Sequence, residues 1–373
     1  MGAITRGIAN NILGNGAVDG TDALTGTIPA TNISNPSLAN LTTFPPSVDA
    51  GIPEVAGDPP APSDGDVWYN TNTYKLRVRG VSDALGSWAT GVDMNSTKAY
   101  LGVSNSGTQN AALAFAGAIG GASYGVQTEL FDGTTWTEVN DLNTVRAILG
   151  GSGTATAALA VSGYVGPPGN ITNVESWDGT SWTEVNDVNT ASQNSGDAGT
   201  QTAAITYGGY DYNIPGGSAK TESWNGTNWT EVNDLNTARY VVGGNGTQTS
   251  ALAVGGETTV KVAITESWNG TSWTEVSDLN STRNGVSVSG TSNTSAIAAG
   301  GNQDSPSASA LTEFWNGTSW TEVGDLSTGR RGSDSAGSSS SALQVGGISG
   351  GPTYHANTEE WNAGDANLNV DLA

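Results

Sequence analysis

Two kinds of short apolar segment alternate along most of the chain, separated by turns rich in Gly, Asn, Asp and Thr. One is a run of small apolar residues that ends in Gly, as at 251–256. The other is a pair of aromatic residues around a polar turn, as at 268–273. Apolar runs of this length, bounded by Gly and Asn, are typical of β-strands. The pattern therefore predicts an all-β protein.

These segments belong to one internal repeat. The second aromatic of each pair is a Trp that recurs at spacings of 46, 47, 44 and 47 residues, at Trp136, Trp182, Trp229, Trp273 and Trp320. The first aromatic has six copies, which are Phe131, Trp177, Trp224, Trp268, Trp315 and Trp361. A sixth copy of the second Trp is Trp88, because residues 87–88 and 93–98 match 272–273 and 278–283 position for position.

The chain enters this array part-way through a repeat and leaves it part-way through the same repeat. That offset suits a closed ring, in which strands from both ends complete one sheet and leave no open sheet edge. Each repeat holds four predicted strands, and about 46 residues per four-stranded unit is typical of a propeller blade. We therefore expect a six-bladed β-propeller over residues 86–362.

The last two strands of each repeat are joined by a short turn. Its sequence is Asn-Gly at 225–226, 269–270 and 316–317, and Asp-Gly at 132–133 and 178–179. Such pairs favour tight primed turns, in which both central residues have positive φ. We predict a turn of this kind in each of these repeats.

The repeat resembles the kelch family. Kelch repeats carry an apolar strand ending in Gly-Gly, then two spaced aromatics and a turn that ends in Arg. The corresponding residues here are Gly255, Gly256, Trp268, Trp273 and Arg283. The aromatic spacing is shorter than in kelch repeats, and the first aromatic is Trp instead of Tyr. The resemblance implies an all-β, six-bladed kelch-like propeller closed by both termini, and it carries no particular function.

Residues 1–85 do not follow the repeat. We expect an extended N-terminal attachment arm at 1–63, a short β-hairpin module at 64–85 that leads into the ring, and a C-terminal tail at 363–373. The run Gly-Asp-Val-Trp-Tyr-Asn at 65–70 resembles a short β-module of bacteriophage tail-fibre and other virion proteins. The leader and the repeats are also similar to structural proteins of marine bacteriophages. This resemblance implies a place on the exterior of a phage particle.

Composition removes several classes of chemistry. The chain has no Cys and one His, which excludes thiolate sites and multi-histidine centres, so we expect no metal and no cofactor. Its 35 acidic and 12 basic residues give a net charge of −23, which repels nucleic acids and anionic membranes. No apolar run reaches the roughly 20 residues of a membrane span, so we expect no membrane insertion.

Charged residues also recur with the repeat. A residue present in every blade is expected to serve the blade, because an active site needs asymmetry. We predict that the basic position pairs with a recurring carboxylate, or forms a hydrogen-bonded turn, and so locks neighbouring blades. The acidic positions are Glu138, Glu184, Glu231, Glu275 and Glu322, and Asp141, Asp187, Asp234, Asp278 and Asp325. The basic position holds Lys98, Arg146, Arg239, Arg283 and Arg330, with Ser192 in one repeat.

The sequence does not predict an enzyme. A copper oxidase of kelch-like fold needs a Cys and several His residues, which this chain lacks. A sialidase-like glycosidase also has six blades, but it needs an asymmetric Arg triad and a Tyr nucleophile. General glycoside hydrolysis needs a unique pair of carboxylates facing a cleft, and no such pair stands out.

The Trp pairs are expected to pack between blades and not to bind sugars. These structural positions are Trp88, Trp136, Trp182, Trp229, Trp273, Trp320, Trp177, Trp224, Trp268, Trp315 and Trp361. Better binding candidates lie where the repeat is broken, in the variable loops between the second and third strands. Aromatic, Asn and Asp side chains on a rigid scaffold suit carbohydrate or protein recognition. The candidates are Tyr124, Tyr164, Tyr210, Asp211, Tyr212, Asn302, Asp304, Tyr354 and His355.

Three functions are compatible with these observations. The first is a non-enzymatic phage tail fibre or adhesin, whose loops bind a host surface glycan or protein while residues 1–85 bind other virion proteins. The second is a capsid or tail decoration protein with no receptor role, and the third is a sialidase-like glycosidase. The receptor, the place on the head or tail, the oligomeric state and calcium binding by the Asp/Asn turns stay open. Residues 1–85 suit a homo-oligomeric fibre and a monomer equally.

Overall fold

The computed structural model describes residues 54–56, 59, 67–70, 72 and 75–369, apart from 121–122, 168, 213–215, 305–306 and 352. All regular elements within these ranges are β-strands. The chain divides into two units, one of residues 86–363 and one of residues 1–85 with 364–373. Most of the arm predicted at 1–63 lies outside the described residues.

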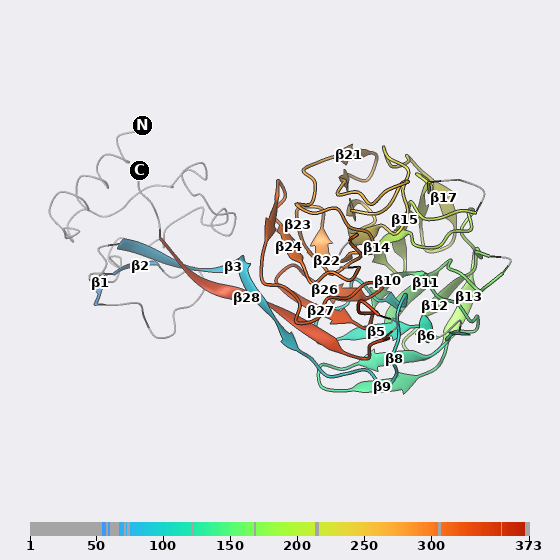
Figure 1. Ribbon diagram of the computed structural model, residues 1–373, viewed down its shortest axis with the longest axis horizontal. Coiled ribbons are helices and arrows are strands. Elements are labelled where there is room, and N and C mark those ends of the chain that lie inside the picture. The colour runs from blue at the N-terminus through green and yellow to red at the C-terminus, as the bar shows by residue number, and fades with distance from the viewer. Residues whose placement is uncertain are drawn as a thin grey trace. The chain divides into compact units, whose positions relative to one another are not determined.

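The larger unit is a six-bladed β-propeller, and each blade is a four-stranded antiparallel sheet (Figure 1). The first blade contains β4 (Gly102–Val103), β5 (Ala112–Phe115), β8 (Thr128–Phe131) and β9 (Trp136–Val139), and the second contains β10 (Gly150–Thr154), β11 (Ala157–Val161), β12 (Val174–Trp177) and β13 (Trp182–Val185). The third contains β14 (Gly196–Thr200), β15 (Ala203–Tyr207), β16 (Thr221–Trp224) and β17 (Trp229–Glu231), and the fourth contains β18 (Gly243–Thr247), β19 (Ser250–Val254), β20 (Thr265–Trp268) and β21 (Trp273–Glu275). The fifth contains β22 (Ser287–Ser292), β23 (Ser295–Ala299), β24 (Thr312–Trp315) and β25 (Trp320–Glu322).

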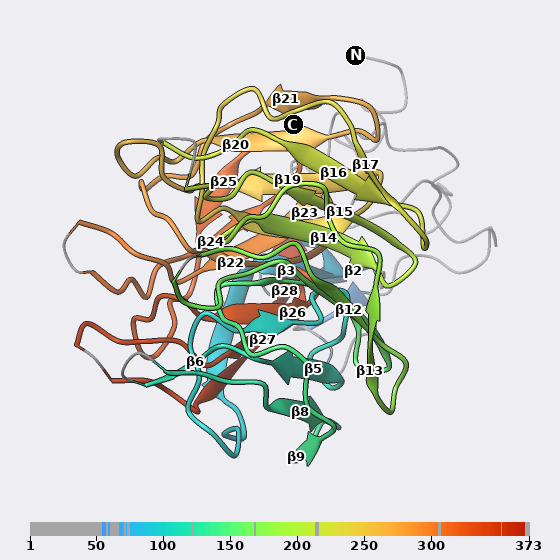
Figure 2. The ribbon, with the colours of Figure 1, turned by 90° about the vertical axis from the view of Figure 1, so that its right-hand side faces the viewer.

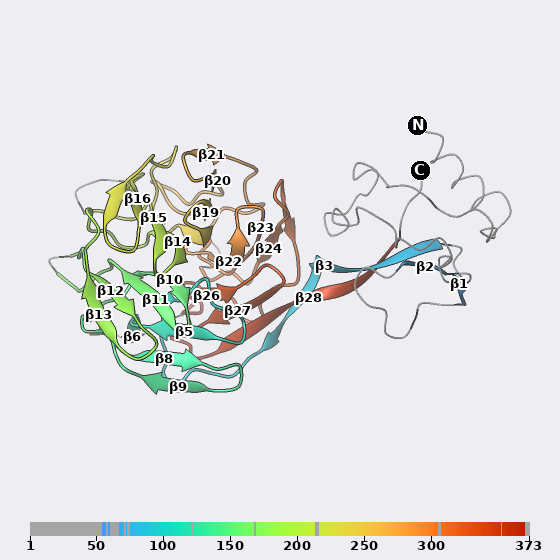
Figure 3. The same ribbon diagram turned by 180° about the vertical axis from the view of Figure 1, so that it is seen from behind.

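The sixth blade closes the ring with strands from both ends of the chain. Its inner strands are β26 (Asp334–Gly337), β27 (Ser341–Val345) and β28 (Thr358–Asn369), and β3 (Lys75–Thr90) follows β28 in the sheet order. Trp88 on β3 thus occupies the place that the second Trp has in the other blades. The innermost strands β10, β14, β22 and β26 surround the centre in the views from both sides (Figures 1 and 3). The predicted all-β, six-bladed ring closed by both termini is confirmed.

The smaller unit contains a β-hairpin. Strand β2 (Val67–Asn70) pairs antiparallel with the first part of β3, with Val67 opposite Val78 and Asn70 opposite Lys75. The short strand β1 (Glu54–Val55) lies parallel to β2, and the Trp68 side chain is buried. Residues 364–369, for which we expected a tail, continue strand β28.

The turns between the third and fourth strands differ from the predicted primed turns. Strands β16 and β17 pair as far as Trp224 and Trp229, which leaves a four-residue loop. In this loop Gly226 has φ +88°, whereas Asn225 is not left-handed. The Asn225 side-chain oxygen accepts the backbone N–H groups of Thr227 and Asn228. The prediction of two positive φ angles was therefore wrong, because the Asn or Asp caps the loop with its side chain.

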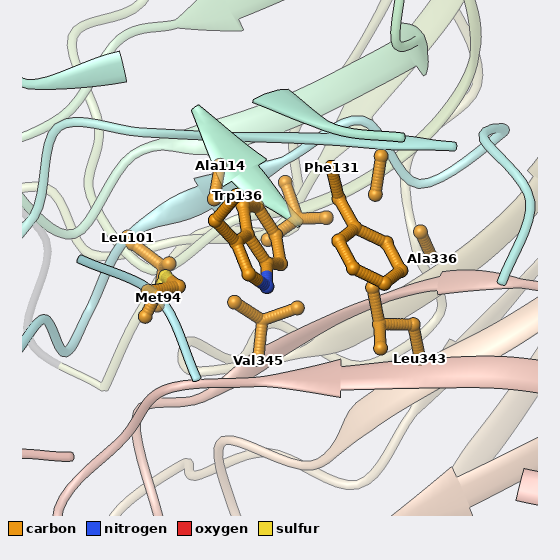
Figure 4. Close-up of a cluster of buried hydrophobic side chains, with 10 residues drawn as sticks. Met94, Leu101, Ala114, Phe131, Trp136, Ala336, Leu343 and Val345 are labelled. Atoms are coloured by element: carbon orange, nitrogen blue, oxygen red, sulfur yellow. The ribbon is translucent and has the colours of Figure 1, made fainter. Parts of the chain in front are cut away.

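Hydrophobic clusters fill the seams between neighbouring blades. The cluster in Figure 4 joins the first and sixth blades: Phe131 and Trp136 stack at 5.0 Å between ring centroids, next to Leu343 and Val345 of β27. Because consecutive residues of a strand point to opposite faces of the sheet, each blade buries side chains against both neighbours. Apolar clusters of this kind therefore recur around the ring.

A buried ion pair repeats at five of the six seams. Lys98 lies 3.0 Å from Glu129, Arg146 3.1 Å from Glu175, Arg283 2.8 Å from Glu313 and Arg330 2.5 Å from Glu359, and Arg239 pairs with Glu266. Each of these Glu residues also accepts the backbone N–H of a residue in the turn of the preceding blade, such as Asn236 for Glu266. Burial lowers the pKa of Arg146 to about 10, so this guanidinium stays charged at neutral pH.

The carboxylate of this ion pair is not the one that the repeat suggested. The predicted partners at Glu138, Glu184, Glu231, Glu275 and Glu322 lie exposed on the outer strands. Asp141, Asp234, Asp278 and Asp325 accept a backbone N–H from the third strand of their own blade. The paired carboxylate lies on the third strand, two residues before the first aromatic, where the chain of the preceding turn can reach it.

The second Trp of each blade contacts the neighbouring blade. The indole nitrogens of Trp182, Trp273 and Trp320 each lie 3.1 Å from the hydroxyl of a Thr on the third strand of the preceding blade. Trp88 makes the same bond to Thr312 at 3.0 Å, across the closing seam. Trp229 makes none within the described residues, because Val174 stands where the other blades have Thr. The first Trp of each blade instead donates to a backbone carbonyl, as Trp224 does to Gln201 at 2.9 Å.

Candidate functional site

The variable loops and the loops that enter each blade meet on one face of the ring, which we call the loop face. Backbone bridges join the two kinds of loop at the same place in every blade. The bridged pairs are Ala99 and Ala118, Ala147 and Tyr164, Gln193 and Tyr210, Tyr240 and Glu257, Asn284 and Asn302, and Arg331 and Ile348. Figure 2 shows the ring from its side, with β6 (Ala118–Gly120) among the loops of this face. Here the repeated backbone carries side chains that vary from blade to blade.

Five tyrosines form a continuous row on the loop face, which we call the tyrosine arc. Neighbouring ring centroids in the arc are 5.2–6.2 Å apart. In order around the ring the residues are Tyr124, Tyr164, Tyr212, Tyr210 and Tyr240. The arc therefore spans four blades, from the loop of β7 (Ser123–Tyr124) to the loop that enters the fourth blade.

The arc rests on backbone that leaves room for the rings. Gly169 has φ +144°, and a Cβ there would lie 3.0 Å from the Tyr212 ring, so Tyr212 packs directly on this glycine. The Tyr210 backbone pairs with that of Gln193, and its carbonyl accepts the Asn170 side chain at 2.6 Å. Tyr212 nevertheless remains 52% exposed. The rings are thus positioned by the scaffold while part of their surface faces solvent.

The raised pKa values of Tyr124, Tyr212 and Tyr240 keep these phenol groups protonated at neutral pH. Burial raises the pKa of Tyr124, and Tyr354 lies near enough to add to that rise. Burial, and to a smaller extent a hydrogen bond to Glu257, raises the pKa of Tyr240 to about 12. A neutral phenol both donates and accepts hydrogen bonds. The arc therefore offers apolar ring faces together with directional polar groups.

A cavity of about 410 Å³ lies at the centre of the ring. Its lining includes one residue from the entry of each blade, and all six have φ between +54° and +62°. These six residues, which we call the entry ring, are Tyr100, Ile148, Asn194, Val241, Gly285 and Gly332. The N–H groups of the first five donate to the carbonyl of the entry-ring residue of the preceding blade at 2.6–3.2 Å. A chain of backbone hydrogen bonds thus encircles the cavity.

The entry ring holds strained backbone. Ile148 and Val241 are β-branched, and a positive φ is a true outlier for such residues. Strain of this kind costs on the order of 1–3 kcal/mol per residue and persists where the surrounding structure imposes it. Here the encircling hydrogen bonds impose it. The cavity therefore has a wall fixed by the fold before any ligand arrives.

Two carboxyl groups that line the cavity have no ion pair with a basic residue in the described part of the chain. Asp197 on β14 and Asp334 on β26 replace Gly at inner-strand positions of other blades. Burial raises the pKa of each to about 7, and the charge of Asp197 adds to the rise at Asp334. Asp334 accepts N–H groups of Val103 and Ser335 at 3.1 and 2.8 Å, while the Asp197 Oδ1 atom is buried with no hydrogen-bond partner in the described residues. Two carboxyl groups of the described residues thus line one cavity, although the sequence did not reveal them.

The remaining predicted site residues lie at separate places on the loop face. Asn302 lines the central cavity. Asp304 pairs with Lys261 at 2.6 Å and is largely exposed. Asp211 is half-buried between the two tyrosines of the third blade. The His355 Nδ1 atom lies 3.2 Å from the Asn357 side chain, and Tyr354 bridges to Ile348.

Sequence reasoning missed Tyr100, Tyr240, Arg331, Asp197 and Asp334. The first three lie in the loops that enter the blades, one or two residues after the recurring Lys or Arg, whereas the predicted site residues all lie between the second and third strands. The two Asp residues replace Gly in the first strand of their repeats. An alignment of all six repeats, read for the residues that differ, would have found each of them.

Chemical alternatives for this face are limited. Within the described ranges no three or more His, Cys, Asp or Glu side chains gather to hold a metal ion. The same residues include no helix long and apolar enough to cross a membrane. The loop face is therefore an aromatic row beside a small polar cavity.

Comparison with known proteins supports the fold. Among solved structures, the chain is similar to the protein YjhT, with a TM-score of 0.60 and 14% sequence identity. The match covers 71% of this chain and 95% of that one, and at this identity it shows the propeller fold alone. No family model matches the chain, and no curated protein sequence matches it.

Proposed function

We propose that this protein is a non-enzymatic bacteriophage tail fibre or adhesin, whose loop face binds a host surface glycan while residues 1–85 anchor it to the particle. The tyrosine arc is the observation that carries the proposal. It joins five aromatic rings from four blades on a face where the side chains do not follow the sequence repeat. A scaffold alone does not require these side chains, since Ala, Gln, Asn or Ile occupy the equivalent positions in other blades.

The chemistry of the arc suits a saccharide. Aromatic rings pack on the C–H faces of sugars, and phenol, Asn and Asp groups supply directional hydrogen bonds to hydroxyls. The rings are supported by the backbone, as at Gly169 and Gln193, so little side-chain order must be gained on binding. A glycan chain that runs along the arc would contact several rings in succession.

The resemblance of residues 65–70 to a virion β-module supports the phage assignment. In that module Val67–Asn70 forms strand β2, and its Trp68 is buried. A hairpin with its own buried Trp suits an attachment element more than a simple linker. We infer that the partners of residues 1–85 are other virion proteins.

Two measurements test the proposal. Immunogold electron microscopy of the source particles, with antibody against residues 86–362, should label the tail tip. Label over the head would favour a decoration protein, and the absence of label from every particle would refute the virion assignment. A glycan array should show binding by the wild type and its loss in Tyr212→Ser, with Glu138→Gln on the outer strand β9 as the matched surface control.

The carboxyl pair in the cavity favours a glycosidase as second candidate. Asp197 and Asp334 each have a pKa raised to about 7, which suits a general acid at neutral pH. Release of reducing sugar from bound glycan, abolished in Asp334→Asn, would establish that activity. Binding without any release of sugar, under the same conditions, would leave recognition as the function.

A further inference from the structure

We propose that the central cavity binds a carboxylate-bearing sugar unit of the glycan, with the Arg331 guanidinium as the group that recognises the carboxylate. This inference rests on the proposed glycan recognition by the loop face. It adds a second contact region, lined by none of the tyrosines of the arc, and it specifies the charge of the ligand.

Arg331 differs from the other basic residues of the propeller. Seven Lys and Arg side chains described in residues 86–363 pair with a carboxylate, five at the seams and two, Lys220 and Lys261, on the surface. For Arg331 the structure shows neither an ion pair nor a side-chain hydrogen bond within the described residues, and its Nε atom is buried without a partner. In a chain of net charge −23, a half-buried guanidinium that remains without a carboxylate is an available anion contact.

The position of Arg331 directs this contact to the cavity. Arg331 lines the cavity, and its backbone is fixed by two hydrogen bonds with Ile348 at 2.8 and 3.0 Å. The next residue is Gly332 of the entry ring, where a Cβ would lie 2.7 Å from the Tyr100 ring. The Tyr100 ring therefore lies directly over Gly332. An aromatic face and an unpaired guanidinium thus flank the same part of the wall.

The wall of the cavity offers both apolar and polar contacts to a sugar ring. Tyr100, Ile148 and Val241 contribute apolar side chains, and Asn194, Asn302 and Arg331 contribute polar ones. A pyranose has C–H faces that suit the apolar side chains and a polar edge that suits the polar ones. A cavity of about 410 Å³ is large enough for one such ring.

The chemistry of the polar side chains favours a carboxylate over other anions. A guanidinium presents a planar fork that matches a carboxylate with two parallel hydrogen bonds. Arg331 is the only basic residue among those that line the cavity, and one charge balances a carboxylate monoanion better than a phosphate dianion. The raised pKa values of Asp197 and Asp334 leave both groups partly protonated near neutral pH, which reduces their repulsion of a bound anion.

Calorimetric titration of the full chain with paired sugars tests the inference. The probes are glucuronate, its methyl ester, and glucose. The wild type should bind glucuronate about ten- to a hundredfold more tightly than the ester, the range expected for hydrogen bonds to a charged group. Arg331→Gln should lower glucuronate affinity to that of the ester, and Arg331→Lys, which keeps the charge but loses the fork, should fall between them.

The control is Lys261→Gln, because Lys261 is a basic residue on the same face that already pairs with Asp304. This variant should retain the preference for glucuronate. Thermal unfolding of each variant establishes that it is folded. Equal affinity of the wild type for glucuronate and its ester, or glucuronate binding unchanged in Arg331→Gln, would overturn the inference.

The same design separates this inference from the proposed function. If neutral glycans bind and Tyr212→Ser abolishes that binding, while Arg331→Gln changes nothing, glycan recognition stands and the carboxylate site is refuted. If the wild type binds glucuronate through Arg331 but Tyr212→Ser has no effect on any glycan, the cavity site stands and the arc is refuted. If no sugar binds at all, both are refuted.

Discussion

The seams between blades and the loop face use the same backbone in opposite ways. At the seams the same side chains return from blade to blade: a Trp, a Thr that accepts its N–H, and a buried Lys or Arg with its Glu. On the loop face the bridged positions hold Ala, Tyr, Glu, Asn and Ile in turn. The two regions differ in exposure as well, from 0–2% for the paired seam groups to 52% for Tyr212.

This difference separates stability from recognition. A seam residue is repeated because every blade needs the same contact, so its removal should reduce the free energy of unfolding. A residue of the loop face is free of that requirement, so its removal should affect binding and leave the fold intact. A seam variant with an unchanged free energy of unfolding, or a loop variant with a much lower one, would contradict this difference.

The largest effect is expected from a seam ion pair. Glu266→Ala would leave Arg239 charged and buried without its partner, which typically costs about 3–5 kcal/mol. Chemical denaturation measures the change. The control is Glu275→Ala on β21, which removes an exposed Glu and should change stability by no more than about 0.5 kcal/mol. Equal stability of the two variants would show that the repeated pair is not a structural lock.

Removal of a seam Trp should come next and also tests the closure of the ring. Trp182→Ala removes a buried ring and its bond to Thr128, at a cost of about 3–5 kcal/mol. Trp88→Ala should cost less, because Trp88 is only half-buried, yet more than a surface substitution, because its indole reaches Thr312 of the fifth blade. A melting temperature unchanged in Trp88→Ala would contradict closure by the N-terminal strand.

The fold was predictable because the repeat is so regular. The offset between the first and last copies placed Trp88 in the closing blade, and the structure confirms that ring. The turns and ion pairs were less predictable. The Asn225 side chain accepts a backbone N–H group of its own loop, which replaces the predicted positive φ at Asn225. The paired carboxylate at Glu266 is one of several recurring acids, and only the three-dimensional structure shows which of them lies next to the Arg.

The site was predictable only in part. The loop tyrosines at 124, 164, 210 and 212 were identified as departures from the repeat, and the structure brings their rings together. The cavity residues were missed because a ring brings together positions that are about 46 residues apart in sequence. Asp197 and Asp334 are isolated substitutions in the sequence, and only the ring brings them to the wall of one cavity.

The buried Asp197 carboxyl of the cavity should make the stability of the protein depend on pH. The pKa of Asp197 is raised from 3.8 to about 7 on folding, so the native state binds the proton more tightly than the unfolded state. The raised pKa contributes up to about 4 kcal/mol to the free energy of unfolding, at 1.36 kcal/mol per pKa unit. This contribution is present in full below pH 4 and is lost as the pH rises to 7. Asp197→Asn should therefore be more stable than the wild type at pH 8 and not at pH 4. Parallel stability profiles of the two proteins from pH 4 to 8 would contradict a buried carboxyl.

The smallest effect concerns the seam at which the Trp229 indole lacks a hydroxyl partner. Val174→Thr should supply the hydroxyl that Trp229 lacks, and one hydrogen bond typically contributes about 1 kcal/mol. A rise in the free energy of unfolding, absent when Trp229 is first replaced by Phe, would identify the indole N–H as the cause. No gain from the Thr would mean that the repeated Trp–Thr bond contributes little at any seam.

The most direct test of the central claim, that broken repeat positions serve recognition and repeated ones serve stability, is a double variant of the arc. Tyr210→Ser with Tyr212→Ser should lower binding of the labelled protein to host cells at least tenfold, while its free energy of unfolding stays within about 1 kcal/mol of the wild type. Full binding by a stable double variant, or a loss of stability as large as that of Trp182→Ala, would contradict the account.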